Sequence, residues 1–202
     1  MNKKRVLLLG DSILCGAKGI HGYGYYVRKA LAGQCDVFLP TDNCQDICYM
    51  ARFADELIPD VEGAFDLIHW NNGLWDVLHF AGNPNPYTTM ATYEEKLTDF
   101  SCYLKRRWPE AVICFALTTP VAEHLQNTSS FRKNAEIEAY NAAAVRVLSG
   151  RVDTFDDLYG AALQMSDQTR AKDGLHYSEK AACCLAKEVC DFLRRVYKDI
   201  DR

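Results

Sequence analysis

Residues 5–13 read RVLLLGDSI, an apolar run over Arg5–Leu9 that stops at Gly10 and is followed directly by Asp11 and Ser12. The run is too short for a helix, and an uninterrupted apolar run is typical of a strand buried on both faces. Glycine permits a sharp turn at the end of such a strand. We therefore predict a buried strand over residues 5–9 that presents Ser12 just beyond its carboxyl end.

The rest of the chain alternates short apolar runs with longer amphipathic stretches. Strands are predicted over residues 36–39, 65–70, 111–117 and 152–155, and helices over 22–31, 45–57, 93–108, 131–148 and from Ser178 to about 198. This alternation predicts a parallel sheet covered by helices on both faces. With five strands, we expect an α/β fold of the flavodoxin-like kind, a three-layer α/β/α sandwich around a five-stranded parallel sheet. Ligands of such sheets bind at the carboxyl ends of the strands, where Ser12 lies.

The composition is that of an ordinary globular protein, with 202 residues, 49% hydrophobic and 25% charged, and a formal net charge of -4. No linker-like stretch divides the chain, so we predict one domain over residues 1–202. The mild acidity, without a basic stripe, argues against a nucleic-acid partner. No apolar run is long enough for a membrane span or a secretory leader, and we expect a cytoplasmic protein without a membrane partner. The sequence carries no indication of the oligomeric state.

The cysteine content is high, but its spacing is not that of a metal site or a disulfide framework. No Cys-x-x-Cys occurs among the nine cysteines, which are residues 15, 35, 44, 48, 102, 114, 183, 184 and 190. Paired cysteines or histidines at short spacing would be needed to bind zinc. We predict small buried thiols in a reducing compartment and no metal.

Two polar segments at opposite ends of the chain carry reactive side chains. Ser12 follows the first predicted strand, and the segment Asp173-Gly174-Leu175-His176 precedes the last predicted helix. A serine hydroxyl needs a base to take its proton, and a carboxylate three residues before a histidine can hold one ring nitrogen while the other faces the serine. Each segment alone is unspecific, because Asp11 or Ser12 would equally cap a helix.

The other histidines fit a structural or solvated role better. We predict His69 to lie in the core, because it falls inside a strand, and His21, His79 and His124 to lie in solvated loops.

Together, the two polar segments resemble the first and last sequence blocks of the SGNH/GDSL hydrolases. Gly10-Asp11-Ser12-Ile13 is similar to the first block, Asp173-Gly174-Leu175-His176 is similar to the last, and the resemblance spans nearly the whole chain. It implies the flavodoxin-like sandwich, a triad of Ser12, His176 and Asp173, ester hydrolysis, and no metal ion or organic cofactor.

The middle blocks of that family differ here. The family has a glycine after its second strand that gives an N–H to the oxyanion hole, whereas residues 40–45 read PTDNCQ and leave Asn43 or Cys44 to supply it. The family's third block is Gly-x-Asn-Asp, whereas residues 73–76 read GLWD. Residues 70–76 (WNNGLWD) resemble a variant with an Asn-x-Gly-Leu-x-Asp third block, in which Asn71 is the candidate amide ahead of Asn72. The expected hole is thus formed by Ser12, Asn43 and Asn71, although these amides would equally serve to tie the loop together.

Four side chains are predicted to bind substrate at the rim of the pocket, namely Asn72, Trp75, Thr119 and Arg132. Flat aromatic rings stack on sugar rings, so an aromatic, amide-rich rim favours a short acyl group carried by a sugar. The polar stretch 79–89 is either a lid over the pocket or only a long connection.

The sequence therefore predicts a serine esterase that removes short acyl groups such as acetyl from a carbohydrate or another small-molecule ester. A lipid or thioester acylhydrolase is one alternative. A carbohydrate-binding member of the same fold with weakened catalysis is another, because losing one oxyanion donor costs roughly a hundred- to a thousandfold in rate. A nucleotide-binding domain is disfavoured, because no Gly-x-Gly-x-x-Gly follows the first strand.

Overall fold

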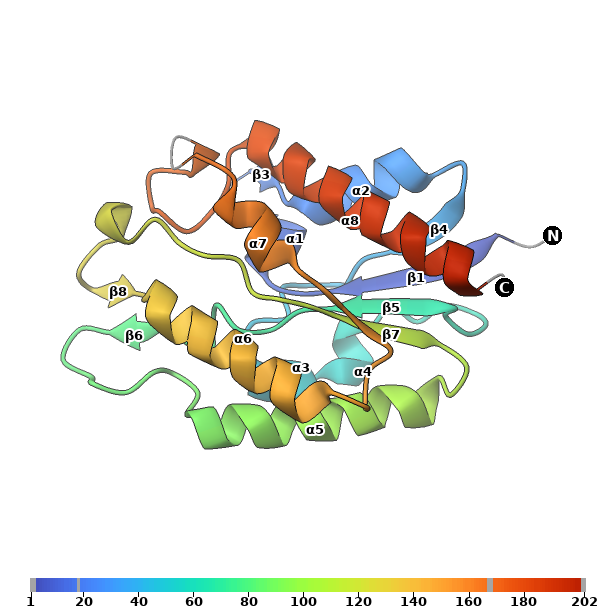
Figure 1. Ribbon diagram of the computed structural model, residues 1–202, viewed down its shortest axis with the longest axis horizontal. Helices are drawn as coiled ribbons and strands as arrows, with labels where there is room; N and C mark the ends of the chain where they lie inside the picture. Colours follow the sequence, from blue (N-terminus) through green and yellow to red (C-terminus); the bar gives the residue numbers. More distant parts are fainter. Residues whose placement is uncertain (1–2, 18, 167–168, 201–202) are drawn as a thin grey trace.

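The computed structural model describes residues 3–17, 19–166 and 169–200, with the side chains of 198–200 excepted. Its centre is a five-stranded sheet in the order β4-β1-β5-β7-β9 (Figure 1). The strands are β1 (Lys4–Leu9), β4 (Cys35–Phe38), β5 (Leu67–Trp70), β7 (Val112–Ala116) and β9 (Thr154–Asp156), and every neighbouring pair is parallel. The strand order reverses at β1, as in the flavodoxin-like arrangement. The predicted fold class is confirmed.

Helices cover both faces of this sheet. In Figure 1, α2 (Tyr23–Leu31), α7 (Leu158–Leu163) and α8 (Glu179–Ile200) lie above it, whereas α3 (Ile47–Arg52), α4 (Ala54–Leu57), α5 (Met90–Arg107) and α6 (Asn134–Leu148) lie below. Helix α2 packs on α8, and α5 packs on both α3 and α6. The three layers explain why the strands are continuous apolar runs, since both of their faces are covered.

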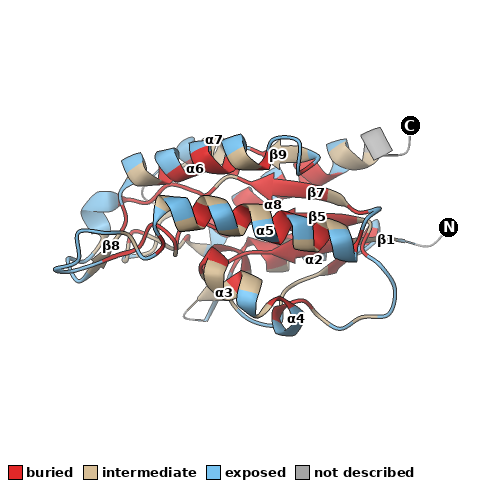
Figure 2. Cartoon of the chain, turned by 90° about the horizontal axis from the view of Figure 1, so that it is seen from below, coloured by how far each residue is buried: buried red, intermediate tan, exposed pale blue. Residues whose placement is uncertain are grey.

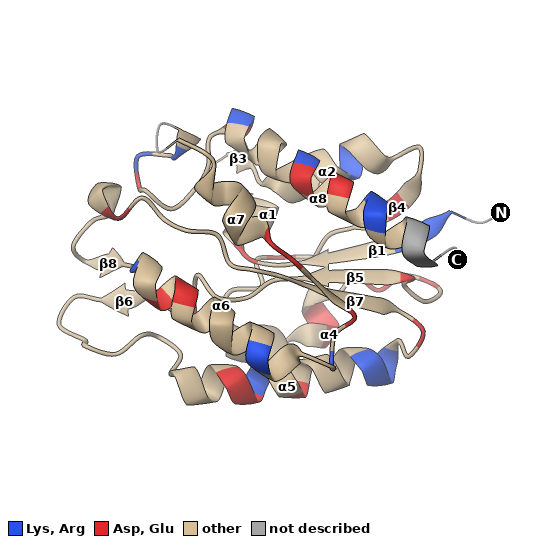
Figure 3. Cartoon of the chain, viewed as in Figure 1, with Lys and Arg blue, Asp and Glu red and all other residues tan. Residues whose placement is uncertain are grey.

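The core is one continuous cluster that contains most of the sheet. Val6, Leu7, Leu8 and Leu9 have no exposed surface, and the strands are buried throughout the middle layer in Figure 2. Along α8 the buried and exposed residues alternate in pairs, which is the pattern of a helix with one face on the core. In Figure 3 the charged residues of the helices occur in short groups of either sign, separated by uncharged turns.

Two of the predicted helices differ clearly from the observed ones. The helix predicted over 45–57 is two helices, because the backbone leaves helical geometry at Phe53 (φ −110°, ψ 24°). The first of them starts at Ile47, where the Asp46 carboxylate accepts hydrogen bonds from Cys48 N and Tyr49 N. Helix α6 starts only at Asn134, because residues 130–131 form strand β8 (Ser130–Phe131).

Several short elements have no counterpart in the sequence prediction. They are α1 (Ser12–Cys15), the hairpin of β2 (Gly16–Ala17) and β3 (Ile20–His21), strand β6 (His79–Phe80), which pairs antiparallel with β8, the 3₁₀ turn η1 (Glu123–Leu125), and α7. All of them lie beyond the carboxyl ends of the central strands, at the edge where Ser12 is placed (Figure 1).

The cysteines are all free thiols, but only four of the nine are buried: Cys35, Cys44, Cys114 and Cys190. Cys102, Cys183 and Cys184 are exposed, which corrects the prediction that the thiols are buried. Both Cys183 and Cys184 lie on the outer face of α8, where a helical period places them away from the core. Among the described residues no helix is both long and apolar enough to cross a bilayer.

Candidate active site

The turn after β1 places Ser12 at the start of helix α1. Asp11 is the N-cap, with extended backbone geometry (φ −88°, ψ −155°), and its Oδ1 accepts a hydrogen bond of 2.8 Å from Ile13 N. The N–H of Ser12 belongs to the first turn, where the helix offers no acceptor, and no hydrogen bond from it is found to any described residue. The cap is therefore Asp11, and Ser12 keeps both its hydroxyl and its N–H for the site.

A second turn, residues 171–177, holds His176. Ala171 N donates to His176 O at 2.7 Å, and Gly174 takes the left-handed geometry (φ 70°) that closes the turn. Asp173 Oδ1 accepts from Leu175 N at 3.1 Å and from His176 N at 3.0 Å. The same carboxylate meets the imidazole, with Asp173 Oδ2 at 2.9 Å from His176 Nδ1.

The two turns meet across 164 positions of sequence. His176 Nε2 lies 2.9 Å from Ser12 Oγ, so the three predicted residues form one chain of hydrogen bonds. Because Asp173 faces Nδ1, the neutral imidazole carries its proton there and presents the Nε2 lone pair to the serine hydroxyl. This arrangement can take the proton of Ser12 as its oxygen forms a new bond.

A small cavity of about 40 Å³ opens beside Ser12 and His176. Its far wall is the hairpin β2–β3, with Gly16, Ala17 and Ile20. The hairpin is tight: Gly16 has φ 100°, and a Cβ on Gly22 would overlap Leu14 O. The glycines at positions 16, 19 and 22 were the sequence signal for this missed element, because glycines at such short spacing are typical of tight turns.

The candidate oxyanion donors are largely bonded to the protein. Asn71 Nδ2 donates to Ala116 O at 2.7 Å and to Thr118 Oγ1 at 3.3 Å, so its amide spans from β5 to the end of β7. Cys44 N donates to Gly10 O at 3.2 Å and ties the loop after β4 to the nucleophile turn.

Asn43, the other candidate in that loop, has its N–H directed to the side-chain oxygen of Asp42 at 2.6 Å, and its own Oδ1 accepts from Gln45 N. The remaining polar group of Asn43 is its side-chain NH2.

For two of the residues predicted to bind substrate, burial argues against that role. Asn72 has no exposed surface, accepts from Trp70 Nε1 at 2.7 Å and donates to Gln45 O at 3.1 Å, so its amide ties the loop together. Thr119 is buried and lines a small internal cavity with Asp11, behind the nucleophile. Trp75 is half-buried, on the same loop as Asn72.

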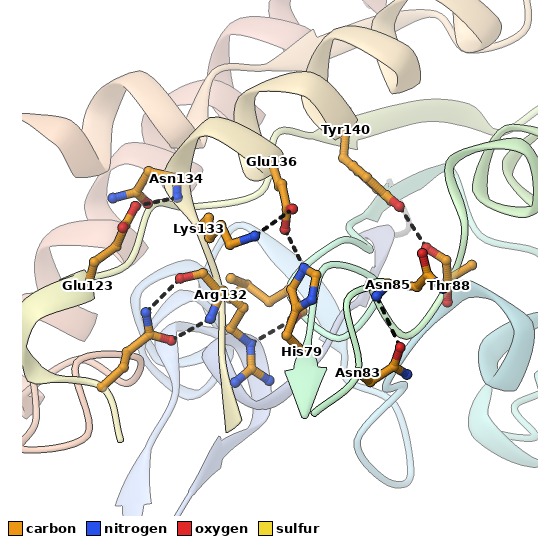
Figure 4. A network of polar contacts seen from close by, with 12 residues as sticks. His79, Asn83, Asn85, Thr88, Glu123, Arg132, Lys133, Asn134, Glu136 and Tyr140 are labelled. Atoms are coloured by element: carbon orange, nitrogen blue, oxygen red, sulfur yellow. Dashed lines mark hydrogen bonds and ion pairs between the residues drawn. The ribbon is translucent and has the colours of Figure 1, made fainter. Parts of the chain in front are cut away.

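Arg132, the fourth predicted substrate residue, is buried and held rigidly. Its Nε donates to Leu74 O at 2.8 Å, and its backbone N and O make a reciprocal pair with the amide of Gln126, at 2.8 and 2.7 Å (Figure 4). Asn134 and Asn141 on α6 make similar reciprocal pairs with Val121 and Thr118, which fix the loop after β7 on that helix. The sequence did not show these clamps, because an asparagine in a helix is usually a solvated residue.

The prediction for one histidine is confirmed and the prediction for another is wrong. His69 is buried in the core, as predicted, with Nε2 at 2.9 Å from Asp156 Oδ2. The prediction for His79 is wrong, because its ring is buried, stacks on Phe131 and pairs with Glu136 at 2.6 Å (Figure 4). The stretch 79–89 accordingly begins as a paired strand, and at its far end Thr88 N donates to Asp76 O at 3.0 Å.

Asp76, the last residue of the WNNGLWD segment, is a fully buried carboxyl group. Its Oδ1 accepts from Ile47 N at 3.2 Å, and its Oδ2 has no partner among the described residues. Burial, together with the nearby negative charge of Asp46, raises the pKa of Asp76 to about 7, against the backbone hydrogen bond from Ile47.

The fold is shared with solved hydrolase structures. A lipase/acylhydrolase from Enterococcus faecalis is 17% identical, with 94% of this chain and 95% of that chain covered and a TM-score of 0.74. A carbohydrate esterase family 3 protein from Talaromyces cellulolyticus is 17% identical, with 97% and 99% covered and a TM-score of 0.67. Axe2, an acetylxylan esterase from Geobacillus stearothermophilus, is 18% identical, with 96% and 94% covered and a TM-score of 0.68. No family model matches the sequence, and no curated protein matches it.

Proposed function

We propose that the protein is a serine esterase in which Ser12 is the nucleophile, His176 the general base and Asp173 the residue that orients the histidine. The observation that carries this proposal is the hydrogen-bond chain from Ser12 Oγ through His176 to Asp173, each link 2.9 Å, at the carboxyl end of β1. The shared fold with an acylhydrolase and two carbohydrate esterases supports the same class of reaction.

The reaction proceeds through an acyl-enzyme. Ser12 Oγ bonds to the ester carbonyl carbon while His176 Nε2 takes the hydroxyl proton, and the alcohol leaves with that proton. Water then adds with the same base, and the carboxylic acid is released. The Ser12 N–H is the first oxyanion donor. Asn71 is proposed as a second, by exchanging its long contact with Thr118 Oγ1 for the oxyanion, and the side-chain NH2 of Asn43 as a third.

The acyl group is proposed to be short. The cavity beside Ser12 measures about 40 Å³, and its walls include the small residues Gly16, Ala17, Ala171 and Ala182. An acetyl group suits such a space better than a fatty chain. A carbohydrate is the proposed carrier of the acyl group. The support is the half-buried indole of Trp75 on the loop after β5 and the likeness to carbohydrate esterases.

A second candidate is a carbohydrate-binding protein of the same fold with weakened catalysis. The observation in its favour is that the Asn71 amide is already bonded to Ala116 and Thr118.

Turnover of p-nitrophenyl acetate tests the esterase directly. We expect hydrolysis by the wild type, loss of at least about a thousandfold in kcat for Ser12→Ala, and unchanged activity for Ser149→Ala, an exposed serine at the end of α6. A fluorophosphonate probe should label the wild type at Ser12. Equal inertness of wild type and Ser12→Ala, with Ser12 unlabelled, would favour the binding protein.

A series of esters from acetate to octanoate then tests the length of the acyl group. We expect kcat/KM to fall steeply beyond the shortest members, and a preference for the octanoate would instead indicate the lipid acylhydrolase.

A further inference from the structure

The guanidinium of Arg132 is a buried cation whose hydrogen-bonding capacity is mostly unused. Only 7% of the residue is exposed, and Nε is its one bonded side-chain nitrogen, to Leu74 O. Neither terminal nitrogen has a hydrogen-bond partner among the described residues, and neither is sealed from solvent. Up to four N–H groups of a side chain that the fold holds in place are therefore left without a protein acceptor, and they retain slight contact with solvent.

The guanidinium lies where three segments of the site converge. Its Nε is bound to the loop that follows Asn71, and the negative charges of Asp11 and Asp173 both act on it. These carboxylates are directed elsewhere: Asp173 binds His176, and Asp11 caps α1. Burial lowers the pKa of Arg132 and the two aspartates oppose that effect, yet an arginine keeps its charge at neutral pH.

Such a group is costly to the fold unless something accepts its hydrogen bonds. Planar guanidinium nitrogens match the two oxygens of a carboxylate, and the bond is strengthened by both charges. The Gln126 clamp fixes the arginine backbone before any ligand arrives, which reduces the entropy lost on binding. Arg132 does not line the small cavity beside Ser12, which the proposed function assigns to the acyl group, so we infer that a ligand of Arg132 lies on the other half of the ester.

We propose that Arg132 binds a carboxylate on the alcohol half of the substrate, so that the preferred substrates are short-chain acyl esters of carboxylate-bearing alcohols, such as an O-acylated sugar acid. This inference rests on the proposed esterase function and narrows its substrate class. The competing role for Arg132 is balance of the charges of Asp11 and Asp173, which would require no anionic substrate.

A matched pair of aryl acetates separates these roles. The probes are 4-acetoxybenzoate, whose leaving group carries a carboxylate, and 4-acetoxybenzamide, which has the same shape without the charge. We expect the wild type to prefer the carboxylate by about tenfold to a hundredfold in kcat/KM, the range of one charged hydrogen-bonded pair. Arg132→Gln should abolish that preference. Arg132→Lys should keep only part of it, because lysine lacks the planar fork. Lys133→Gln, which removes the neighbouring exposed cation, should leave the preference intact.

Product inhibition supplies a measurement on the wild type alone, in case the Arg132 variants fail to fold. 4-Hydroxybenzoate should inhibit more tightly than 4-hydroxybenzamide by a similar factor. Equal kcat/KM for both acetates together with equal inhibition, or an Arg132→Gln variant that loses both activities equally, would overturn the proposal in favour of charge balance. Absence of turnover with either acetate, with Ser12 unreactive to fluorophosphonate, would instead overturn the proposed esterase.

Discussion

Replacing Asp76 by asparagine should change how the stability of the fold depends on pH. The Asp76 carboxyl group is fully buried, its Oδ2 has no partner among the described residues, and its pKa is raised from 3.8 to about 7, mainly by burial. A carboxyl group whose pKa is higher in the folded state binds its proton more tightly there. Its contribution to stability is complete below pH 3.8 and is lost as the pH rises toward 7.

The size of the effect follows from the shift. About 3 pKa units correspond to a free energy of unfolding of about 4 kcal/mol over the full range. Between pH 5 and pH 8 the part that is lost is about 3 kcal/mol. Asparagine keeps an oxygen to accept the Ile47 N–H but has no charge to bury. From pH 5 to pH 8 the free energy of unfolding of the variant should therefore rise relative to that of the wild type by about 3 kcal/mol, whatever its absolute stability.

Urea unfolding followed by circular dichroism at pH 5, 6, 7 and 8, at constant ionic strength, measures this difference. Other titrating groups are common to both proteins and cancel in the comparison. Asp60→Asn is the matched control, because Asp60 is exposed. Its free energy of unfolding should follow that of the wild type at every pH. A difference between Asp76→Asn and the wild type that stays constant from pH 5 to pH 8 would refute the reasoning from burial.

Two further predictions concern the triad and the loop after β5. Asp173→Asn should lower kcat for p-nitrophenyl acetate by roughly 10³–10⁴-fold, because the imidazole loses the partner that fixes its tautomer. Asp191→Asn, on the outer side of α8, should leave the rate unchanged, and similar rates for both variants would exclude Asp173 from the triad. Gly73→Ala should cost more than about 2 kcal/mol, because Gly73 has φ 155° and a Cβ would overlap Thr118 Oγ1. Gly33→Ala, with open space around it, should cost less than about 1 kcal/mol, and thermal unfolding that ranks the two glycines the other way round would contradict the packing argument.

The central layers could be predicted from the sequence, because their signal is local. Most residues of the run RVLLL and of its four counterparts are buried or half-buried, and α8 shows its core face in a plain helical period. The elements that surround the site were missed for the opposite reason. A two-residue strand such as β2 or β6 is defined by its partner, and no periodicity can appear in so few residues. The helix break at Phe53 lacks a glycine or a proline to mark it.

The same contrast between local signals and contacts with distant segments applies to the residues of the site. Ser12, Asp173 and His176 could be singled out from the sequence, because their two segments together resemble the first and last blocks of the SGNH/GDSL hydrolases. The amides could not, since Asn71 and Asn72 have the same chemistry and differ only in what they contact. One spans to the end of β7 and the other is sealed against Trp70 and Gln45. Burial of Thr119 and the unused nitrogens of Arg132 likewise depend on distant segments.

The 164-residue separation between the serine and its base has a consequence for refolding. Catalysis needs the first strand seated in the sheet and the turn at 171–177 held against Ala122, whose N–H donates to Gly174 O. Helices form from local contacts within microseconds, whereas the docking of this distant turn is a non-local step. After dilution from denaturant, the recovery of esterase turnover should therefore lag behind the return of the far-ultraviolet helical signal. If the proposed triad is correct, release of the chromophore measures the fraction of molecules in which both ends of the chain are docked.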